Sequence, residues 1–187
     1  MDSNLTGILE ASYLPQREAE SKLGQMGYQY DNSLSSMDTK VFFDPRTNQP
    51  HIVYRGSTRV SDWLDNANLA LGGKSKSRDE AIRVAIAAKD KYGKAPTTYG
   101  HSRGSIFAED AGEATGGQSY TYNKAILPSD IFKKIRPEQT DVRTSKDIVS
   151  RLSGFQKGGT KVVIESPQSD SYLLAHQIKG ANRFKIR

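Results

Sequence analysis

The first third of the chain shows two patterns of apolar residues. Apolar side chains recur at helical spacing from Leu5 up to Pro15, and again from Gln16 to Met26. Residues 39–43 are rich in β-forming side chains, residues 44–50 have the composition of a turn, and residues 51–54 are again β-forming. We therefore expect two packing helices followed by an antiparallel hairpin.

The remainder of the chain alternates helical and extended patterns. Residues 71–77 are small, polar and basic, which indicates a surface loop. Ser77, with Glu80 three residues later, forms a capping-box pattern in front of a regular apolar stripe, so a helix is expected to begin there. A strand is expected over residues 95–99 and a helix over 105–114. Further strands are expected over residues 119–122, 140–143, 161–165 and 172–176, with a short helical turn near Asp147. This order predicts an α/β fold with a mostly parallel sheet, an antiparallel edge hairpin and flanking helices.

The length of 187 residues fits one domain over residues 1–187 with a substantial core. No apolar run approaches the roughly 18 residues of a membrane span. The first residues also lack the basic segment and apolar core of a signal peptide. We therefore expect a protein that is intracellular or associated with a virion.

The chain contains no cysteine and three histidines. The absence of cysteine excludes disulfides, thiolate metal ligands and a cysteine nucleophile. Three histidines disfavour the usual zinc constellations. We expect neither a cofactor nor a metal.

The formal net charge of +6 raises the question of an anionic partner. The basic residues form three separated clusters in polar loops and at the C-terminus, which favours a solvated surface. These clusters are Lys74, Lys76 and Arg78; Lys133, Lys134 and Arg136; and Arg183, Lys185 and Arg187. No nucleic-acid-binding motif accompanies them, so we expect no specific nucleic-acid recognition and keep an anionic membrane surface as a candidate partner.

The stretch from Tyr99 to Ser105 fits the pattern G-x-S-x-G, with Ser102 at its centre. In this nucleophile elbow a serine occupies a tight strand-to-helix turn, and glycines let the neighbouring backbone approach closely. The motif is short enough to occur by chance. It needs a base, an acid and an oxyanion site elsewhere in the chain.

A serine hydroxyl becomes a nucleophile only when an imidazole takes its proton and a carboxylate orients that imidazole. His101 adjoins Ser102, where successive side chains diverge, and His51 precedes the nucleophile at the start of a strand. His176 follows a late strand, as the order serine, acid, histidine requires. His176 is therefore the candidate base.

Three aspartates are candidates for the acid. Asp147 lies in a loop just after the expected strand 140–143, at the carboxyl edge where α/β sites assemble. Asp141 would lie within that strand, and Asp130 lies in the preceding loop. Asp147 is the best placed, although a helix-capping role would also explain it.

Four ordered blocks of the sequence resemble the class 3 lipases, an α/β-hydrolase family. The blocks are Tyr54-Arg55-Gly56-Ser57-Thr58 with Asp62-Trp63-Leu64-Asp65, Tyr99 to Gly104, Tyr120-Thr121-Tyr122-Asn123, and Lys146 to Leu152. This resemblance implies a minimal α/β-hydrolase fold that acts on a lipid or other ester. It implies Ser102 as nucleophile, His176 as base and Asp147 as orienting acid, with an oxyanion hole at the backbone N–H groups of Ser57 and Arg103.

The elbow departs from the family pattern at two positions. Arg103 replaces the usual leucine and Ser105 replaces a second glycine. The Arg103 guanidinium could attract an anionic head group, or it could pair with Asp62, Asp65 or Glu109. The short basic loop over 71–77 replaces the apolar lid segment of family lipases, which favours a small or head-group-bearing ester.

The small size of the chain and its block from Asp44-Pro45 to Arg55-Gly56 resemble lipase-like proteins of large DNA viruses and of their smaller parasites. This raises the hypothesis of a virion-associated protein that hydrolyses host membrane lipid. The alternative is a hydrolase fold that has lost catalysis and serves in binding or architecture, for example against capsid proteins as a minor capsid component.

Overall fold

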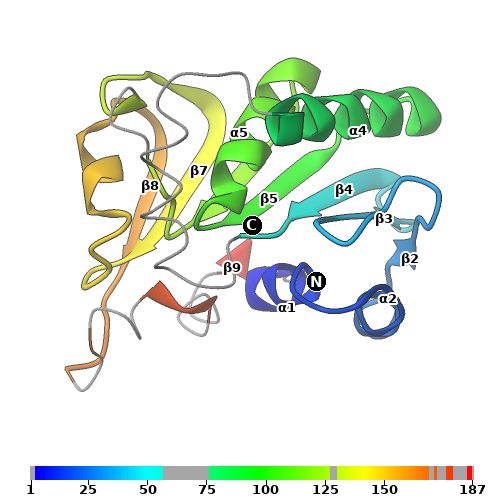
Figure 1. The fold of residues 1–187 in the computed structure, drawn as a ribbon, viewed down its shortest axis with the longest axis horizontal. Coiled ribbons are helices and arrows are strands. Elements are labelled where there is room, and N and C mark those ends of the chain that lie inside the picture. The colour runs from blue at the N-terminus through cyan, green and yellow to red at the C-terminus, as the bar shows by residue number, and fades with distance from the viewer. Residues whose placement is uncertain are drawn as a thin grey trace.

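A seven-stranded β-sheet organises the part of the protein that the computed structural model describes, which comprises residues 3–56, 76–126, 130–168, 171, 176–178 and 185–186 (Figure 1). Its strand order follows the order of the chain from β2 to β8. The strands are β2 (Gln29–Tyr30), β3 (Thr39–Asp44), β4 (Gln49–Tyr54), β5 (Thr97–His101), β6 (Ser119–Tyr122), β7 (Ile135–Thr144) and β8 (Gly158–Ile164).

The sheet is antiparallel at one edge and parallel elsewhere. β2 pairs antiparallel with β3, and β3 pairs antiparallel with β4. From β4 to β8 every neighbouring pair is parallel. The predicted α/β fold with an antiparallel edge hairpin is confirmed. Because β4 to β7 run in the same direction, the loops that follow them open on one edge of the sheet.

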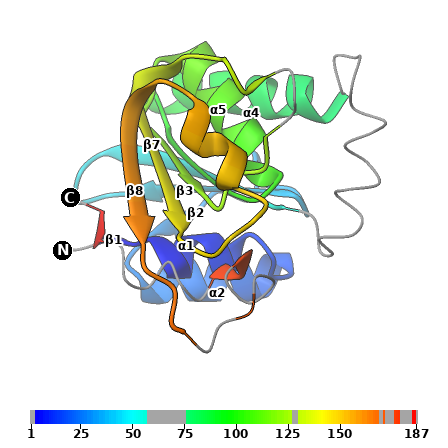
Figure 2. The ribbon, with the colours of Figure 1, turned by 90° about the vertical axis from the view of Figure 1, so that its left-hand side faces the viewer.

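Helices cover both faces of the sheet (Figure 2). On one face, α1 (Leu5–Ala11) and α2 (Gln16–Gln25) bury Leu5, Ile8 and Leu23 in one cluster with apolar side chains of the strands. On the other face, α4 (Lys76–Tyr92) and α5 (Gly104–Thr115) pack through small residues such as Ala85 and Ala111. Both faces of the central strands are therefore buried, as a parallel sheet requires.

Several element boundaries differ from the predicted ones. α4 begins at Lys76, so Ser77 lies in its first turn and is not its N-cap residue. β7 begins five residues before the expected 140–143 strand and contains an irregularity in its pairing with β8 between Ile135 and Thr140. The helical turn expected near Asp147 is instead a loop, followed by a 3₁₀-helix at Arg151–Phe155.

Two short pairings were not predicted. β2 extends the hairpin by two residues, and β1 (Ser3–Asn4) pairs antiparallel with β9 (Lys185–Ile186). Strands this short have no recognisable apolar period. None of the described helices is both long and apolar enough to cross a bilayer.

Parts of three predicted features lie outside the described residues. They are the turn residue Ser57 with the block from Asp62 to Asp65, most of the 71–77 loop, and residues 172–175 of the last expected strand.

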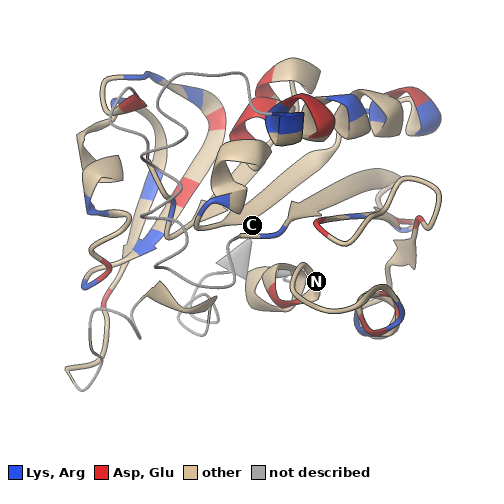
Figure 3. Cartoon of the chain, viewed as in Figure 1, with Lys and Arg blue, Asp and Glu red and all other residues tan. Residues whose placement is uncertain are grey.

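The charged side chains mix both signs along α4 (Figure 3). In the basic cluster that the structure describes in full, Lys133 Nζ lies 3.2 Å from a carboxylate oxygen of Glu113. Arg136 lies 3.6 Å from a carboxylate oxygen of Glu138 and also donates to the Gly117 carbonyl. These contacts show that basic residues of this cluster are partly paired, on the surface that the sequence predicted to be solvated.

Candidate active site

Ser102 lies in the turn between β5 and α5 in a left-handed backbone conformation, with φ of 53°. Its N–H donates to the Tyr122 carbonyl at 3.0 Å, and its carbonyl accepts from Ala125 N–H at 3.2 Å. Non-glycine residues adopt this conformation at an energetic cost, which the surrounding hydrogen bonds offset. The strand-turn-helix geometry of a nucleophile elbow is therefore present, with Ser102 at its apex.

The two glycines of the motif allow this turn to be tight. A Cβ at Gly100 would lie 2.2 Å from the Gly104 carbonyl oxygen, and a Cβ at Gly104 would lie 2.4 Å from the Tyr54 carbonyl oxygen. Gly104 thus lets α5 approach β4. Ser105, one of the two departures from the family pattern, donates from Oγ to the Gly100 carbonyl at 3.0 Å and fits within the turn.

His176 and Asp147 form a buried pair. Nδ1 of His176 lies 2.9 Å from Oδ1 of Asp147, and both side chains are almost fully buried. The backbone N–H groups of Val149 and Ser150 also donate to this carboxylate, at 3.1 and 3.0 Å. Burial alone would raise the pKa of Asp147, but the hydrogen bonds, led by that from His176, lower it below the usual value. Asp147 is therefore a carboxylate that accepts the Nδ1 proton of His176.

The other ring nitrogen of His176 is free to act on a proton. Nε2 is buried and has no hydrogen-bond partner among the described residues. With Nδ1 protonated against Asp147, the neutral ring presents the lone pair of Nε2. His101, adjacent to Ser102, donates from its Nε2 to the His176 carbonyl at 2.8 Å, and the two rings lie 5.0 Å apart. The imidazole is therefore held beside the elbow.

Tyr13, which the sequence did not indicate as a site residue, links His101 to the turn at Gly56. The Tyr13 hydroxyl lies 2.7 Å from Nδ1 of His101. Because Nε2 of His101 donates to a carbonyl, Nδ1 accepts, and the Tyr13 hydroxyl is the donor. The same hydroxyl accepts a hydrogen bond from the Gly56 N–H. Tyr13 follows α1, far from the motif in sequence, so only the packing of α1 against the sheet could reveal its position.

Burial shapes the protonation of this network. Loss of solvent around His101 lowers its pKa to about 3, with a further contribution from the neighbouring His176. Burial likewise raises the pKa of Tyr13 to about 12. His101 is therefore neutral, and its two nitrogens have fixed and opposite roles as acceptor and donor.

The other two candidate acids, Asp141 and Asp130, contact residues other than His176. Asp141 accepts from the Thr121 hydroxyl at 2.6 Å and lies 3.3 Å from the buried ammonium of Lys124, which also pairs with Glu109. Asp130 precedes β7, and its carbonyl accepts from the Gln156 side chain. Of the three candidate aspartates, the structure brings Asp147 to His176.

His51 occupies an aromatic cluster in the core. Its ring stacks on Phe42, with centroids 5.2 Å apart, and its Nδ1 lies 3.0 Å from the Tyr99 hydroxyl. Burial lowers the pKa of His51 to about 4, so the ring is neutral at physiological pH. These contacts define a packing role.

Of the two residues expected to form an oxyanion hole, the structure describes one. Arg103 lies between Ser102 and the first residue of α5, and Ser57 lies outside the described residues. Gly56, which precedes Ser57, is close to Ser102, because a Cβ on Gly56 would lie 3.4 Å from that of Ser102. Within the described chain, no three His, Asp or Glu side chains gather as metal ligands.

The sheet order, the elbow and the helices on both faces define an α/β-hydrolase fold of the lipase type. The structure of the Rhizomucor miehei lipase propeptide complex has the same fold, with a TM-score of 0.60 at 14% sequence identity. The match covers 95% of this chain and 75% of that chain. At such low identity the similarity shows the fold alone.

Sequence comparison narrows the class to a family. The phospholipase-like family described as "Tle-like phospholipase domain" matches residues 9–175, and the chain belongs to this family. An extracellular phospholipase A1 from Serratia liquefaciens is 34% identical over 74 residues. That match spans 40% of this chain and 23% of the curated relative, so the chain matches about a quarter of the relative's length.

Proposed function

We propose that the protein is a serine carboxylic ester hydrolase of the phospholipase or lipase type, in which Ser102, His176 and Asp147 form the catalytic triad. The observation that supports this most strongly is the buried pair of His176 and Asp147 at 2.9 Å, with Nε2 of His176 left unpartnered among the described residues. A buried imidazole without a partner on its basic nitrogen is costly in a purely structural site.

In the proposed reaction His176 Nε2 takes the proton of the Ser102 hydroxyl as Oγ attacks the ester carbonyl carbon. Collapse of the tetrahedral intermediate breaks the bond to the alkoxide, which leaves with the proton from His176. A water molecule, deprotonated by His176, then attacks the acyl-enzyme and releases the acid and free Ser102. Asp147 remains ionised throughout and stabilises the imidazolium.

The backbone N–H groups of Arg103 and Ser57 would stabilise the oxyanion. Arg103 N–H is next to Ser102 at the start of α5, where helix N–H groups lack partners within the helix. Each such donor contributes about 3 kcal/mol to stabilising the transition state.

The substrate we propose is a glycerophospholipid ester, in line with the family and with the phospholipase A1 from Serratia liquefaciens. An anionic membrane surface is the corresponding partner. Association with a virion and with capsid proteins stays a prediction from the sequence alone.

A serine-directed fluorophosphonate probe tests the nucleophile. We expect stoichiometric labelling on Ser102, located by mass spectrometry, and loss of labelling in Ser102→Ala. A Ser105→Ala variant is the matched control, since it removes the other buried hydroxyl of the turn and should still be labelled. Folded protein that the probe does not label would instead support the binding or architectural alternative.

A further inference from the structure

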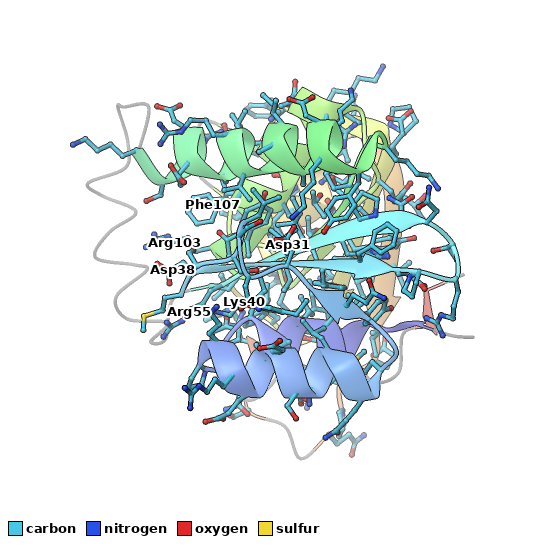
Figure 4. All side chains as sticks on the ribbon, turned by 90° about the vertical axis from the view of Figure 1, so that its right-hand side faces the viewer. Asp31, Asp38, Lys40, Arg55, Arg103 and Phe107 are labelled. Atoms are coloured by element: carbon cyan, nitrogen blue, oxygen red, sulfur yellow. The ribbon has the colours of Figure 1, made fainter. Side chains whose placement is uncertain are left out.

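A cavity of about 640 Å³ opens beside the elbow, between the carboxyl end of β4, the first turn of α4 and the first turn of α5. Tyr54, Ala81 and Phe107 give it an apolar floor. Figure 4 shows Phe107, Arg103, Asp38 and Arg55 in a column at this end of the sheet, between α4 and α2. The cavity thus adjoins the proposed nucleophile and faces outward.

The lining of this cavity has a positive balance. Four basic side chains and two acidic ones contribute to it: Arg55, Lys76, Arg83 and Arg103, with Asp38 and Glu80. The acids are already paired, Glu80 with Arg83 on α4 and Asp38 with Arg55 at 3.6 Å. Among the described residues, no carboxylate pairs with Lys76 or Arg103. The described part of the lining therefore carries two cationic side chains without a carboxylate partner in that part of the chain, and an anion could balance them.

Arg103 is oriented for anion binding by an aromatic ring. Its guanidinium carbon lies 5.4 Å from the centroid of the Phe107 ring. A guanidinium stacked on a ring keeps its N–H edges available, and those edges match the oxygens of a phosphate in a two-point geometry. Glu109, which the sequence offered as a partner for Arg103, is instead bound to Lys124.

The nearby Lys40 does not belong to this set. Its ammonium is fully buried and donates to the carbonyls of Ser36 and Met37, each at 2.7 Å. These bonds hold the loop that carries Asp38 at the rim of the cavity (Figure 4). Lys40 therefore shapes the wall, and the anion-binding capacity comes from Arg103 and Lys76.

The position of the cavity relates it to the reaction. Gly56 and Arg103 both line it, and each is next to the nucleophile, Arg103 in sequence and Gly56 in space. In a glycerophospholipid only the carbons and ester oxygens of the glycerol unit separate the phosphate from the ester carbonyls. A phosphate held in this cavity would leave a carbonyl of the same molecule within reach of Ser102.

We infer that this cavity binds the head-group phosphate of the substrate and selects phospholipids with a net negative head group over zwitterionic ones. The inference rests on the proposed function, since it assigns the substrate of the same site. A zwitterionic head group would bring an ammonium into a cavity with excess positive charge, whereas an anionic one would not.

Binding to Ser102→Ala protein tests this inference without catalysis. Monomeric dihexanoyl phosphatidylglycerol is titrated calorimetrically, with dihexanoyl phosphatidylcholine and inorganic phosphate as separate ligands. We expect phosphatidylglycerol to bind about tenfold tighter than phosphatidylcholine. Equal affinity for the two lipids would overturn the selectivity. If inorganic phosphate bound as tightly as phosphatidylglycerol, the cavity would be a free-phosphate site rather than a head-group site.

Charge variants locate the binding. In the Ser102→Ala background, Lys76→Gln and Arg103→Gln should each weaken phosphatidylglycerol binding about tenfold, because each removes a cation that can form charge-assisted hydrogen bonds to the phosphate. Arg103→Lys keeps the charge without the stacked fork and should lose less. Lys94→Gln is the control, because this exposed lysine follows the C-terminal end of α4, whose first turn lines the cavity, and the variant should bind as the parent does. Unchanged binding in both cavity variants would refute the assignment.

The two proposals can fail separately. One outcome is that binding is selective and is lost in the cavity variants, while fluorophosphonate fails to label the wild-type protein. This outcome would support the head-group site and reject the hydrolase. Labelled wild type with no head-group selectivity would support the hydrolase and reject the site.

Discussion

At the scale of single residues, hydrogen bonds determine which ring nitrogens of the neighbouring His101 and His176 are available to accept a proton. Both nitrogens of His101 are engaged, one by the Tyr13 hydroxyl and one by the His176 carbonyl. His176 uses only Nδ1, against Asp147, and its Nε2 has no partner in the described chain. Of this adjacent pair, His176 alone retains a basic nitrogen for chemistry.

Replacing Asp147, the proposed orienting acid, tests these two roles. Asp147→Asn should lower kcat for a soluble neutral ester about 10⁴-fold with little change in KM, because an amide can hold the imidazole in the wrong tautomer. Asp141→Asn is the matched control in the other buried carboxylate cluster. It should reduce the free energy of unfolding by about 3 kcal/mol and leave kcat unchanged. Equal losses of kcat in two folded variants would contradict the assignment of Asp147.

Tyr13 is the second residue whose removal is informative. Tyr13→Phe removes the donor to His101 and the acceptor for Gly56 N–H, contacts that connect His101 beside the elbow to the turn at Gly56. We expect a decrease in kcat of about ten- to a hundredfold with KM nearly constant, as small misplacements of catalytic groups produce. Steady-state kinetics on the soluble ester measures it.

Tyr92→Phe provides the control for Tyr13. The Tyr92 hydroxyl donates to Asp31 at 2.8 Å at the C-terminal end of α4, outside the proposed site. Its loss should cost about 1 kcal/mol of stability and leave kcat intact. A merely structural Tyr13 would behave in the same way as Tyr92.

At the scale of elements, the elbow depends on how closely α5 can approach β4. Gly104→Ala would place a Cβ 2.4 Å from the Tyr54 carbonyl oxygen, which is backbone and cannot rotate away. We expect a loss of about 3 kcal/mol in the free energy of unfolding, together with loss of probe labelling at Ser102 as α5 shifts. Urea unfolding and labelling measure the two effects.

Gly24→Ala is the comparison for Gly104. Gly24 lies within α2, and no atom would lie within 4 Å of its Cβ. Alanine there should increase stability by about 0.5–1 kcal/mol and leave labelling unchanged. A destabilised Gly24→Ala variant would mean that general helix substitution, rather than the contact with Tyr54, explains the loss at Gly104.

The elements also show what a sequence pattern can predict. The helices and the hairpin were recognisable because their apolar periods are regular, and β6 was predicted over its observed residues 119–122. β5 lies two residues later than expected, since Thr97 to His101 contains one clearly apolar side chain, Tyr99. The capping-box pattern placed the start of α4 at Ser77, whereas the helix begins one residue earlier, at Lys76. A difference of this size is usual at helix ends.

The candidate site was predictable to a similar extent. Chain order and the motif selected Ser102, His176 and Asp147, and the structure places Asp147 against His176. Tyr13 had no sequence signal, because its role depends on a tertiary contact between residues 88 positions apart. Contacts of that kind become visible only when the helix layer is packed on the sheet.

At the scale of the whole molecule, two histidines are buried neutral in the core, and this couples folding to pH. The pKa of His51 is lowered to about 4 and that of His101 to about 3, both first by burial. Both values lie below the ordinary value of 6.5. As pH falls below 6.5, the unfolded chain therefore binds protons that the folded chain does not, and stability decreases.

Replacing His51 tests how much its protonation contributes to the dependence of stability on pH. His51→Phe keeps an aromatic ring between Phe42 and Tyr28 but leaves the Tyr99 hydroxyl without its partner, so the variant should lose about 1–2 kcal/mol at pH 8. Between pH 6 and 4, its free energy of unfolding should fall less steeply than that of wild type, by up to about 1.4 kcal/mol per pH unit. Urea unfolding at a series of pH values measures both slopes, and a single cooperative transition would agree with the proposed single domain. Parallel slopes for the two proteins would show that His51 is not the group that titrates, because Asp44, Lys94 and Arg46, the charged residues that act on His51, remain in both.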